Sequence, residues 1–456
     1  MREMRSRNLP LTCLIGSIAL VLVACSTAAG PSASPAPRAS DGPAPSISTT
    51  PSTQAPQATV NAWLLVGRAG EPGLQLIEAQ TGEVAIDLPP GAPDPDWHRL
   101  VTARVDGSRT TVSDEIVQPG LGGPKVQLEG AWRLPTIGSE RVSAGVSLDG
   151  STIALVPTNE TPGVSRFAIA SHVLADRLST AREAELRLER VIELPGSFDY
   201  DALSPDGRIL YVAQHLDTLP GAYQVRAVDV STGRLRDGVI VDKRNIDETM
   251  AGWPIAQLRR PDGVVLTLYR GTEHPFIHAL NTIDAWAVCI DLPASKASDA
   301  AAGDWGLAPS DNGAAVYAIN ASLGLAAEIN STELTVRRTS TLQTAAGGSS
   351  AVIVLAKFGH GPVGSAGRVV ASPDGETVWA AGADGILAVG TRDLTVSRRM
   401  LEGTAVDGIA VAPDGLLVFA LIHDGGRIVA LDPGTGRELG TVPGDGFDRL
   451  LSTAPW

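Results

Sequence analysis

A short pattern of apolar and polar positions recurs along the chain and organises it. The clearest copy is residues 204–213, Ser-Pro-Asp-Gly-Arg-Ile-Leu-Tyr-Val-Ala, and two further copies begin at Ala371 and Val411. In each copy an apolar run leads into Asp-Gly, and β-branched and aromatic residues follow. Asp tolerates the left-handed backbone region and Gly adopts it freely, so Asp-Gly between two such runs predicts a tight β-hairpin.

The same turn can be followed through the chain after residue 60. It begins at Asp106, Asp149, Asp206, Asp262, Asp311, Asp374 and Asp414. A full unit continues with two more short strands, as in residues 223–229 and 234–241, which flank a second turn, Ser-Thr-Gly. Four short strands in every 40 to 60 residues or so is the pattern of a β-propeller (about 40 residues or more per blade).

The two ends of the repeated region predict how it closes. Residues 60–88 supply three strands and lack the first strand of a unit, whereas Phe447–Thr453 is a strand left over at the C-terminal end. Adding that strand to the opening sheet would complete a blade and leave no unpaired edge. We therefore expect an all-β fold, a β-propeller of eight blades with four antiparallel strands each, closed by the C-terminal strand joining the N-terminal blade. Seven blades is the alternative if one irregular early unit is misread.

This repeat resembles that of bacterial surface propellers of the Tyr-Val-Thr-Asn type and, more broadly, that of lactonase-like propellers. The resemblance is carried by Ser204–Ala213 with Val228–Gly233, and by Ala412–Gly415 with Ala430–Gly436. It covers most of residues 60–456 at the level of the repeat, but Tyr211-Val-Ala-Gln214 stands in place of the motif that names the family. The resemblance implies the propeller fold and carries no activity over.

The first residues have the parts of a signal peptide in the usual order. Three arginines precede the apolar stretch 11–23, which is too short to span a bilayer comfortably and ends in Leu22-Val-Ala-Cys25. This ending resembles the lipobox of bacterial lipoproteins, which implies that Cys25 receives a lipid and becomes the new N-terminus. An ordinary secretory signal with a chance cysteine is the alternative. The expected organisation is a lipoprotein signal peptide (1–24), a disordered Ser/Ala/Pro-rich tether (25–59) and the propeller (60–456).

Composition and charge limit the partners. The tether is built mainly of Ser, Thr, Ala, Pro and Gly, which cannot bury enough apolar surface to become ordered. Removing residues 1–24 takes three Arg and one Glu from the 36 basic and 50 acidic residues, which leaves a net charge of −16. Such an acidic chain argues against nucleic acid as a partner. We expect a monomer held on the outer side of the cell membrane by its N-terminal lipid.

The sequence lacks several signatures of catalysis. It has no Gly-x-Ser-x-Gly elbow, no His-Glu-x-x-His and no Cys-x-x-Cys. Cys13 would leave with the signal peptide and Cys25 would carry the lipid, so Cys289 remains, and its apolar surroundings predict a small buried thiol. We therefore expect no cofactor and no metal site.

The segment Tyr269–Thr282 has the most unusual composition, with two histidines, an acid and aromatic residues close together. On a helix the two histidines would share a face and could bind one metal ion, but Pro275 and the strand-like periodicity argue against a helix. On a strand they would lie about 13 Å apart, too far for one ion. If the segment binds a ligand, Tyr269, His274 and His278 are the residues that we expect to contact it.

Two functional hypotheses follow. The first is a membrane-anchored, extracytoplasmic β-propeller lipoprotein that acts as a non-catalytic binding or scaffold module of the cell envelope, with a protein or a saccharide as its ligand. The alternative is a lactonase-like or other hydrolytic enzyme with its site at the central channel, where loop carboxylates such as Asp201, Asp217 and Glu273 would converge. Several ionisable groups meeting at the axis with opposed pKa shifts would favour the enzyme.

Overall fold

The structure, a computed structural model, describes residues 62–71, 73–93, 99–116, 123–138, 142–173, 185–245, 249–293, 303–342 and 367–454. The chain divides into the units Met1–Ala55 and Pro56–Trp456, and every described residue belongs to the second. The predicted signal peptide, the tether and the lipidation site Cys25 lie outside the described residues. Within those ranges there is no helix of the length and hydropathy that a membrane crossing would need.

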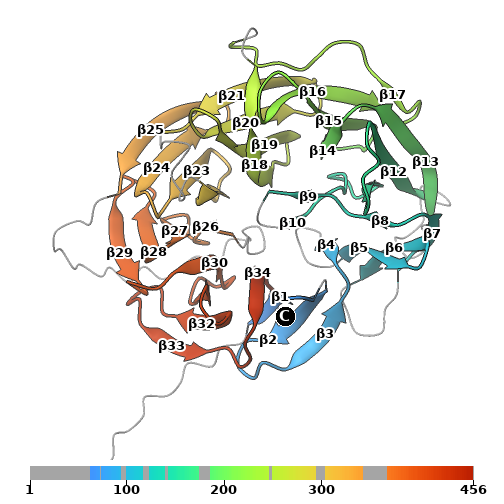
Figure 1. The fold of residues 1–456 in the computed structure, drawn as a ribbon. Coiled ribbons are helices and arrows are strands. Elements are labelled where there is room, and N and C mark those ends of the chain that lie inside the picture. The colour runs from blue at the N-terminus through green and yellow to red at the C-terminus, as the bar shows by residue number, and fades with distance from the viewer. Residues whose placement is uncertain are drawn as a thin grey trace, which may run out of the picture. The chain divides into compact units, whose positions relative to one another are not determined.

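The first sheet joins the two ends of the described chain. It contains β1 (Trp63–Arg68), β2 (Leu74–Glu78), β3 (Val84–Leu88) and β34 (Phe447–Ala454), in the order β3-β2-β1-β34. β34 runs antiparallel to β1, with Leu64 opposite Thr453 and Arg68 opposite Phe447 (Figure 1). The predicted pairing of the leftover C-terminal strand with the opening unit is therefore confirmed.

The following sheets are built from consecutive strands. The second contains β4 (Gly91–Pro93), β5 (Arg99–Asp106), β6 (Arg109–Ile116) and β7 (Lys125–Glu129). The third contains β8 (Trp132–Arg133), β11 (Thr152–Pro157), β12 (Val164–Val173) and β13 (Glu185–Pro195), and β9 (Thr136–Ile137) pairs separately with β10 (Val142–Ser143).

Two further units share one eight-stranded sheet. The earlier unit contains β14 (Phe198–Leu203), β15 (Ile209–His215), β16 (Ala222–Asp229) and β17 (Arg234–Leu235). The later unit contains β18 (Met250–Arg259), β19 (Val264–Gly271), β20 (Phe276–Asn281) and β21 (Trp286–Asp291). They are linked by a short antiparallel pairing of β16 with β18, which places Ala222 opposite Ala251 and Tyr223 opposite Met250.

The last three sheets are again four-stranded. They contain β22 (Trp305–Pro309), β23 (Ala315–Asn320), β24 (Leu325–Asn330) and β25 (Thr335–Thr341); β26 (Val369–Ala371), β27 (Thr377–Gly382), β28 (Gly385–Gly390) and β29 (Val396–Met400); and β30 (Val406–Val411), β31 (Val418–Ile422), β32 (Arg427–Leu431) and β33 (Glu438–Thr441). Successive antiparallel sheets lie side by side in chain order, as the blades of a propeller do (Figure 1). The fold is a β-propeller, as the repeat predicts. The blade count of eight and the closure of the complete ring stay predictions.

The hairpin turns show why the repeated residues are needed. The Ser204 hydroxyl donates to Asp206 Oδ1 at 2.7 Å and accepts the N–H of Ile209 at 2.9 Å, so one side chain connects both strands. Gly207 has a φ of 67°, which a side chain would strain. The same pair of serine contacts holds the turns at Ser147, Ser310 and Ser372. These turns fix the register of the first two strands, and thereby which side chains face the neighbouring sheet.

The core lies between neighbouring four-stranded units rather than within one of them. β-Branched and aromatic side chains from β15 and β16 pack with those of β19 and β20 in one cluster, and β28 packs with β31 and β32 in another. The first cluster contains Tyr211, Tyr223 and Tyr269, whereas the second is mainly aliphatic. The interface with the tyrosines is also where the chain forms a pocket.

Candidate functional site

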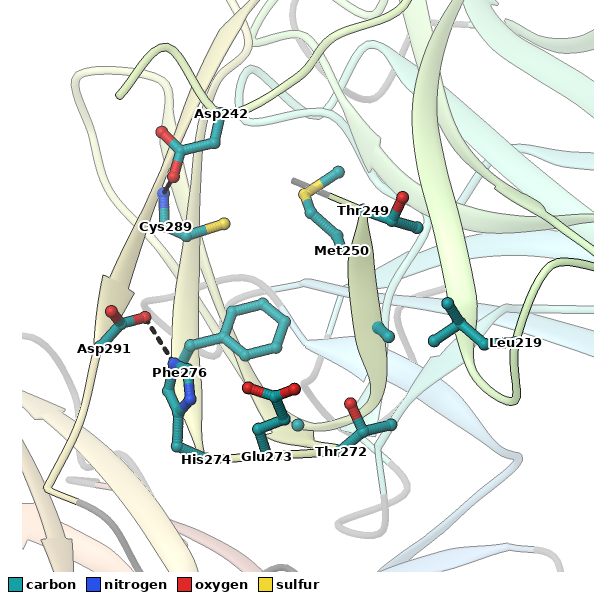
Figure 2. Close-up of a pocket in the computed structure, with 12 residues that line it drawn as sticks. Leu219, Asp242, Thr249, Met250, Thr272, Glu273, His274, Phe276, Cys289 and Asp291 are labelled. Carbon is teal, nitrogen blue, oxygen red and sulfur yellow. Dashed lines mark hydrogen bonds and ion pairs between the residues drawn. The ribbon is translucent and has the colours of Figure 1, made fainter. Parts of the chain in front are cut away.

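A pocket of about 210 Å³ lies at the junction of β16 with β18. Its wall comes from the β15–β16 loop, the segment before β18 and its first residues, the turn between β19 and β20, and β21 (Figure 2). The lining residues are Leu219, Asp242, Thr249, Met250, Ala251, Gly271, Thr272, Glu273, His274, Phe276, Cys289 and Asp291. The pocket therefore draws on two successive units of the propeller.

The turn from Gly271 to Phe276 forms one side of the pocket. A Cβ at Gly271 would lie 2.0 Å from the carbonyl oxygen of His274, so the close return of the chain requires glycine there. After the turn, Pro275 accepts a hydrogen bond from the N–H of Leu292, which ties the turn to the residue after β21. This geometry presents Glu273 and His274 at the pocket (Figure 2).

Asp242 is a buried acid held in place by the backbone. Its side chain is 5% exposed, Oδ1 accepts the N–H of Arg244 at 2.8 Å, and Oδ2 accepts the N–H of Cys289 at 3.1 Å. A parallel bridge from Asp242 to Ala287 attaches this connecting segment to β21. The two backbone hydrogen bonds therefore fix the orientation of this carboxylate at the pocket wall.

A histidine–carboxylate pair lies at the rim. His274 Nε2 and Asp291 Oδ1 are 2.8 Å apart, and the Asp291 side chain is 72% exposed. Figure 2 shows the ring of His274 turned toward Asp291. The pair combines the turn before β20 with the end of β21, which places a proton-binding side chain at the solvent side of the pocket.

Behind the pocket, three aromatic rings are stacked. Phe276 lines the pocket and stacks on Tyr269 with ring centroids 5.1 Å apart and an interplanar angle of 2°, and Tyr269 stacks on Tyr223 at 4.9 Å. All three residues are buried. Stacked aromatic rings have few alternative rotamers in a packed interior, so the orientation of the Phe276 ring is fixed from behind.

Two buried ionisable residues accompany the stack. His278 is fully buried, neither of its ring nitrogens has a hydrogen-bond partner, and its ring centroid lies 6.1 Å from that of Tyr223. Asp201 is 3% exposed, is the extra residue of a β-bulge in β14, and leaves Oδ2 without a partner. The units β14–β17 and β18–β21 meet at these side chains. We call this contact, with Asp201, Tyr223, Tyr269, Phe276 and His278, the polar interface.

Burial shifts the pKa values of these groups in opposite directions. Loss of water raises the pKa of Asp201 to about 7, because the ionised carboxylate loses hydration. The same loss lowers the pKa of His278 to about 4, and the nearby charge of Asp242 opposes that shift. Burial also raises the pKa of Tyr269 well above its usual value. At neutral pH the histidine is neutral, whereas Asp201 is close to its midpoint.

The structure separates the three residues predicted from the sequence. His274 lines the pocket. Tyr269 lies behind Phe276, and His278 faces Cys289 across the pairing of β20 with β21. The side chains of Tyr269 and His278 therefore support the pocket wall, and the prediction that a ligand contacts them stays a prediction. Within the described ranges, no three His, Cys, Asp or Glu side chains lie close enough to hold a metal ion.

The three carboxylates that we expected to converge in a catalytic site lie in different environments. Glu273 lines the pocket, Asp201 is buried in the polar interface, and Asp217 is exposed in the β15–β16 loop. The prediction of a buried thiol at Cys289 needs correction, because this residue is half-buried and lines the pocket. Cys289 lies in β21, which borders the pocket together with the segment before β18. The apolar residues around Cys289 in the sequence do not reveal this pocket.

Sequence reasoning missed two matched histidine–aspartate pairs. His215 Nε2 lies 2.7 Å from Asp199 Oδ2, and His423 Nδ1 lies 2.9 Å from Asp407 Oδ2. The hydrogen bond to the carboxylate raises the pKa of each histidine. Both pairs have the spacing Asp-x6-Asp-Gly-x7-His. Aligning the units on their Asp-Gly turns would therefore have revealed both pairs from the sequence.

The sequence matches no family model, and comparison with curated proteins gives no match. Solved structures are similar in fold. Dihydro-heme d1 dehydrogenase NirN is 14% identical over 89% of this chain and 77% of that chain, with a TM-score of 0.50. Citrobacter koseri AztD is 11% identical over 87% of this chain and 98% of that chain, also at 0.50. A periplasmic gluconolactonase of Pseudomonas aeruginosa, PpgL, is 18% identical over 86% and 98%, at 0.42. The likenesses to NirN and AztD concern the fold alone.

Proposed function

We propose that this protein is a lipid-anchored, extracytoplasmic β-propeller that acts as a non-catalytic binding module, and that the pocket at the junction of β16 and β18 is its ligand site. The observation that carries the proposal is the wall of this pocket. Backbone donors hold Asp242, aromatic stacking holds Phe276, and Asp291 pairs with His274. A wall fixed before the ligand arrives lowers the entropic cost of binding.

The polar contacts fix the charged side chains of the wall. His274 is paired with Asp291 at the rim. Asp242 accepts the backbone N–H of Cys289 and thereby serves to hold the strand. These fixed positions support a role of the charged groups in ligand recognition.

The membrane anchor is supported by the order of the N-terminal parts, namely arginines, an apolar stretch and Leu22-Val-Ala-Cys25. We expect Cys25→Ser to move the protein from the membrane fraction to the soluble fraction, whereas Cys13→Ser within the same apolar stretch leaves it in the membrane. Retention of Cys25→Ser at the membrane would contradict the anchor.

The binding role is tested with the purified full-length chain. We expect the wild-type protein to hydrolyse a panel of ester and lactone substrates no faster than the Glu273→Gln variant does. Turnover that this substitution abolishes would contradict a non-catalytic pocket and favour the hydrolytic alternative.

A further inference from the structure

The size of the pocket limits its ligand to a small molecule. A cavity of about 150 Å³ with an apolar lining is large enough to hold benzene. The present pocket of about 210 Å³ therefore has room for one aromatic ring or a short alkyl chain, together with a small polar group. A protein surface or a polysaccharide chain could place only one such group inside.

One part of the wall is apolar. Leu219, Met250 and Phe276 contribute this part, and Figure 2 shows the Phe276 ring between Met250 and the Glu273–Thr272 turn. Tyr269 covers one face of the Phe276 ring, so the ring meets the pocket through its remaining surface. An aromatic ring held in this way attracts both apolar groups and cations.

The charged part of the wall is negative. Asp242, Glu273 and Asp291 contribute three carboxylates, and His274 is the one side chain among the described lining residues that can carry a positive charge. Asp242 is buried and fixed, whereas Glu273 is exposed at the rim, where its carboxylate points into the space beside Phe276 (Figure 2). Carboxylates grouped around a cavity favour a cationic ligand and repel an anionic one.

From these features we infer that the pocket binds a small organic cation, an ammonium group attached to an aromatic or short alkyl body. The ammonium group lies between Glu273 and Asp242, and the apolar body lies against Phe276 and Met250. The inference rests on the proposed function, because it names the class of ligand for the same pocket. It also differs from the protein or saccharide ligand expected from the sequence.

The test uses three probes that share one body and differ in charge: phenethylamine, 2-phenylethanol and phenylacetate. Calorimetry with the purified full-length chain should show binding of phenethylamine, with the alcohol and the carboxylate at least about tenfold weaker, since neither can form a charge-assisted hydrogen bond to the carboxylates of the wall. Equal binding of all three probes would overturn selection by charge. If that equal binding were lost in Phe276→Leu, the pocket would still be a ligand site and the proposed function would stand.

Variants locate the binding. Glu273→Gln should weaken phenethylamine binding about tenfold or more. Glu402→Gln, which removes an exposed acid between β29 and β30, should leave binding unchanged. Phenethylamine binding that survives both Glu273→Gln and Phe276→Leu would overturn the inference, because the site would lie elsewhere. Absence of binding by phenethylamine at millimolar concentration would also overturn it, while the membrane and turnover assays would still decide the proposed function.

Discussion

Two interfaces between neighbouring four-stranded units have the same hairpin geometry and different interiors. The polar interface joins the units β14–β17 and β18–β21 and contains stacked tyrosines with the buried Asp201 and His278. The interface between β26–β29 and β30–β33, which we call the apolar interface, is packed mainly by aliphatic residues such as Ile386, Val418 and Val429. Asp-Gly turns precede the second strands of all four units. The repeat therefore builds the sheets, and the residues that face between them decide where a binding site forms.

The difference has a physical reason. Aliphatic side chains fill the apolar interface and gain stability by removing apolar surface from water. That interface also buries Nε1 of Trp379 without a hydrogen-bond partner, but the polar interface buries several such nitrogens and oxygens at a cost in stability, and the pocket opens beside them. Natural proteins accept such losses mainly at functional sites.

The largest expected effect concerns the apolar interface. Ile386 is fully buried, so Ile386→Ala should lower the free energy of unfolding by about 2–5 kcal/mol through lost burial and a residual cavity. Denaturant unfolding followed by circular dichroism measures this loss. Ile283→Ala, at a residue that is 63% exposed, is the control and should change stability by about 0.5 kcal/mol or less. Equal effects at the two sites would contradict the packing of this interface.

The next effect depends on pH and concerns Asp201. Its pKa is raised to about 7 in the folded protein, so its contribution to stability is fully present below the usual aspartate pKa and is lost as pH rises through about 7. Asp201→Asn removes this dependence. At pH 4 the variant should match the wild type, and by pH 8 it should be more stable by up to about 4 kcal/mol, at about 1.4 kcal/mol per pKa unit.

Asp407→Asn is the matched control for Asp201. Asp407 is also the extra residue of a bulge in the first strand of its unit, but its side chain is exposed enough to pair with His423 at the surface. The large gain at high pH should therefore be missing from this variant. A difference between wild type and Asp201→Asn that does not vary with pH would show that Asp201 is hydrated in solution.

A smaller effect is expected at His278. Burial lowers the pKa of His278 to about 4, so its contribution to stability is present above pH 6.5 and is lost as pH falls through about 4. Replacing this unpaired ring with an apolar side chain removes a buried polar group. At pH 7, His278→Leu should raise the free energy of unfolding by about 1–3 kcal/mol. Destabilisation of His278→Leu in denaturant unfolding would mean that the ring nitrogens have partners in solution.

The smallest effects concern the two exposed histidine–aspartate pairs. One unit beside each interface carries such a pair, His215 with Asp199 and His423 with Asp407. The carboxylates of Asp199 and Asp407 raise the pKa values of His215 and His423, so Asp199→Asn and Asp407→Asn should lower those pKa values toward 6.5. Each pair stabilises the fold below pH 6.5, and this contribution is lost as pH rises through the folded pKa. Titration of the histidine ring protons by NMR measures both pKa values. Unchanged values in the variants would contradict the pairing.

The repeated turns made the fold predictable from the sequence. Asp206-Gly207 and its counterparts mark hairpins, and Phe447–Thr453 is recognisable as a strand without a partner in its own unit. The site was only partly predictable. His274 and Glu273 fall in the segment with unusual composition, and both line the pocket. The remaining lining residues come from other elements, which a single stretch of sequence cannot bring together.

Asp242 illustrates why the rest could not be predicted. It lies in the connection between β17 and β18, where no alternation of polar and apolar residues marks a strand. Its place follows from a bridge to Ala287 and from a hydrogen bond with Cys289, 47 residues later in the chain. The burial of Asp201 and His278 likewise depends on the packing of one four-stranded unit against the next.

The claim on which the account depends is that ligands bind at the junction of β16 and β18. Crystals of the protein grown with 4-bromophenethylamine test it directly, because anomalous scattering locates the bromine. The account predicts a bromine peak beside Phe276, with the amine between Glu273 and Asp242. A peak at another position alone, or no peak in crystals of a protein that binds this amine in solution, would contradict it.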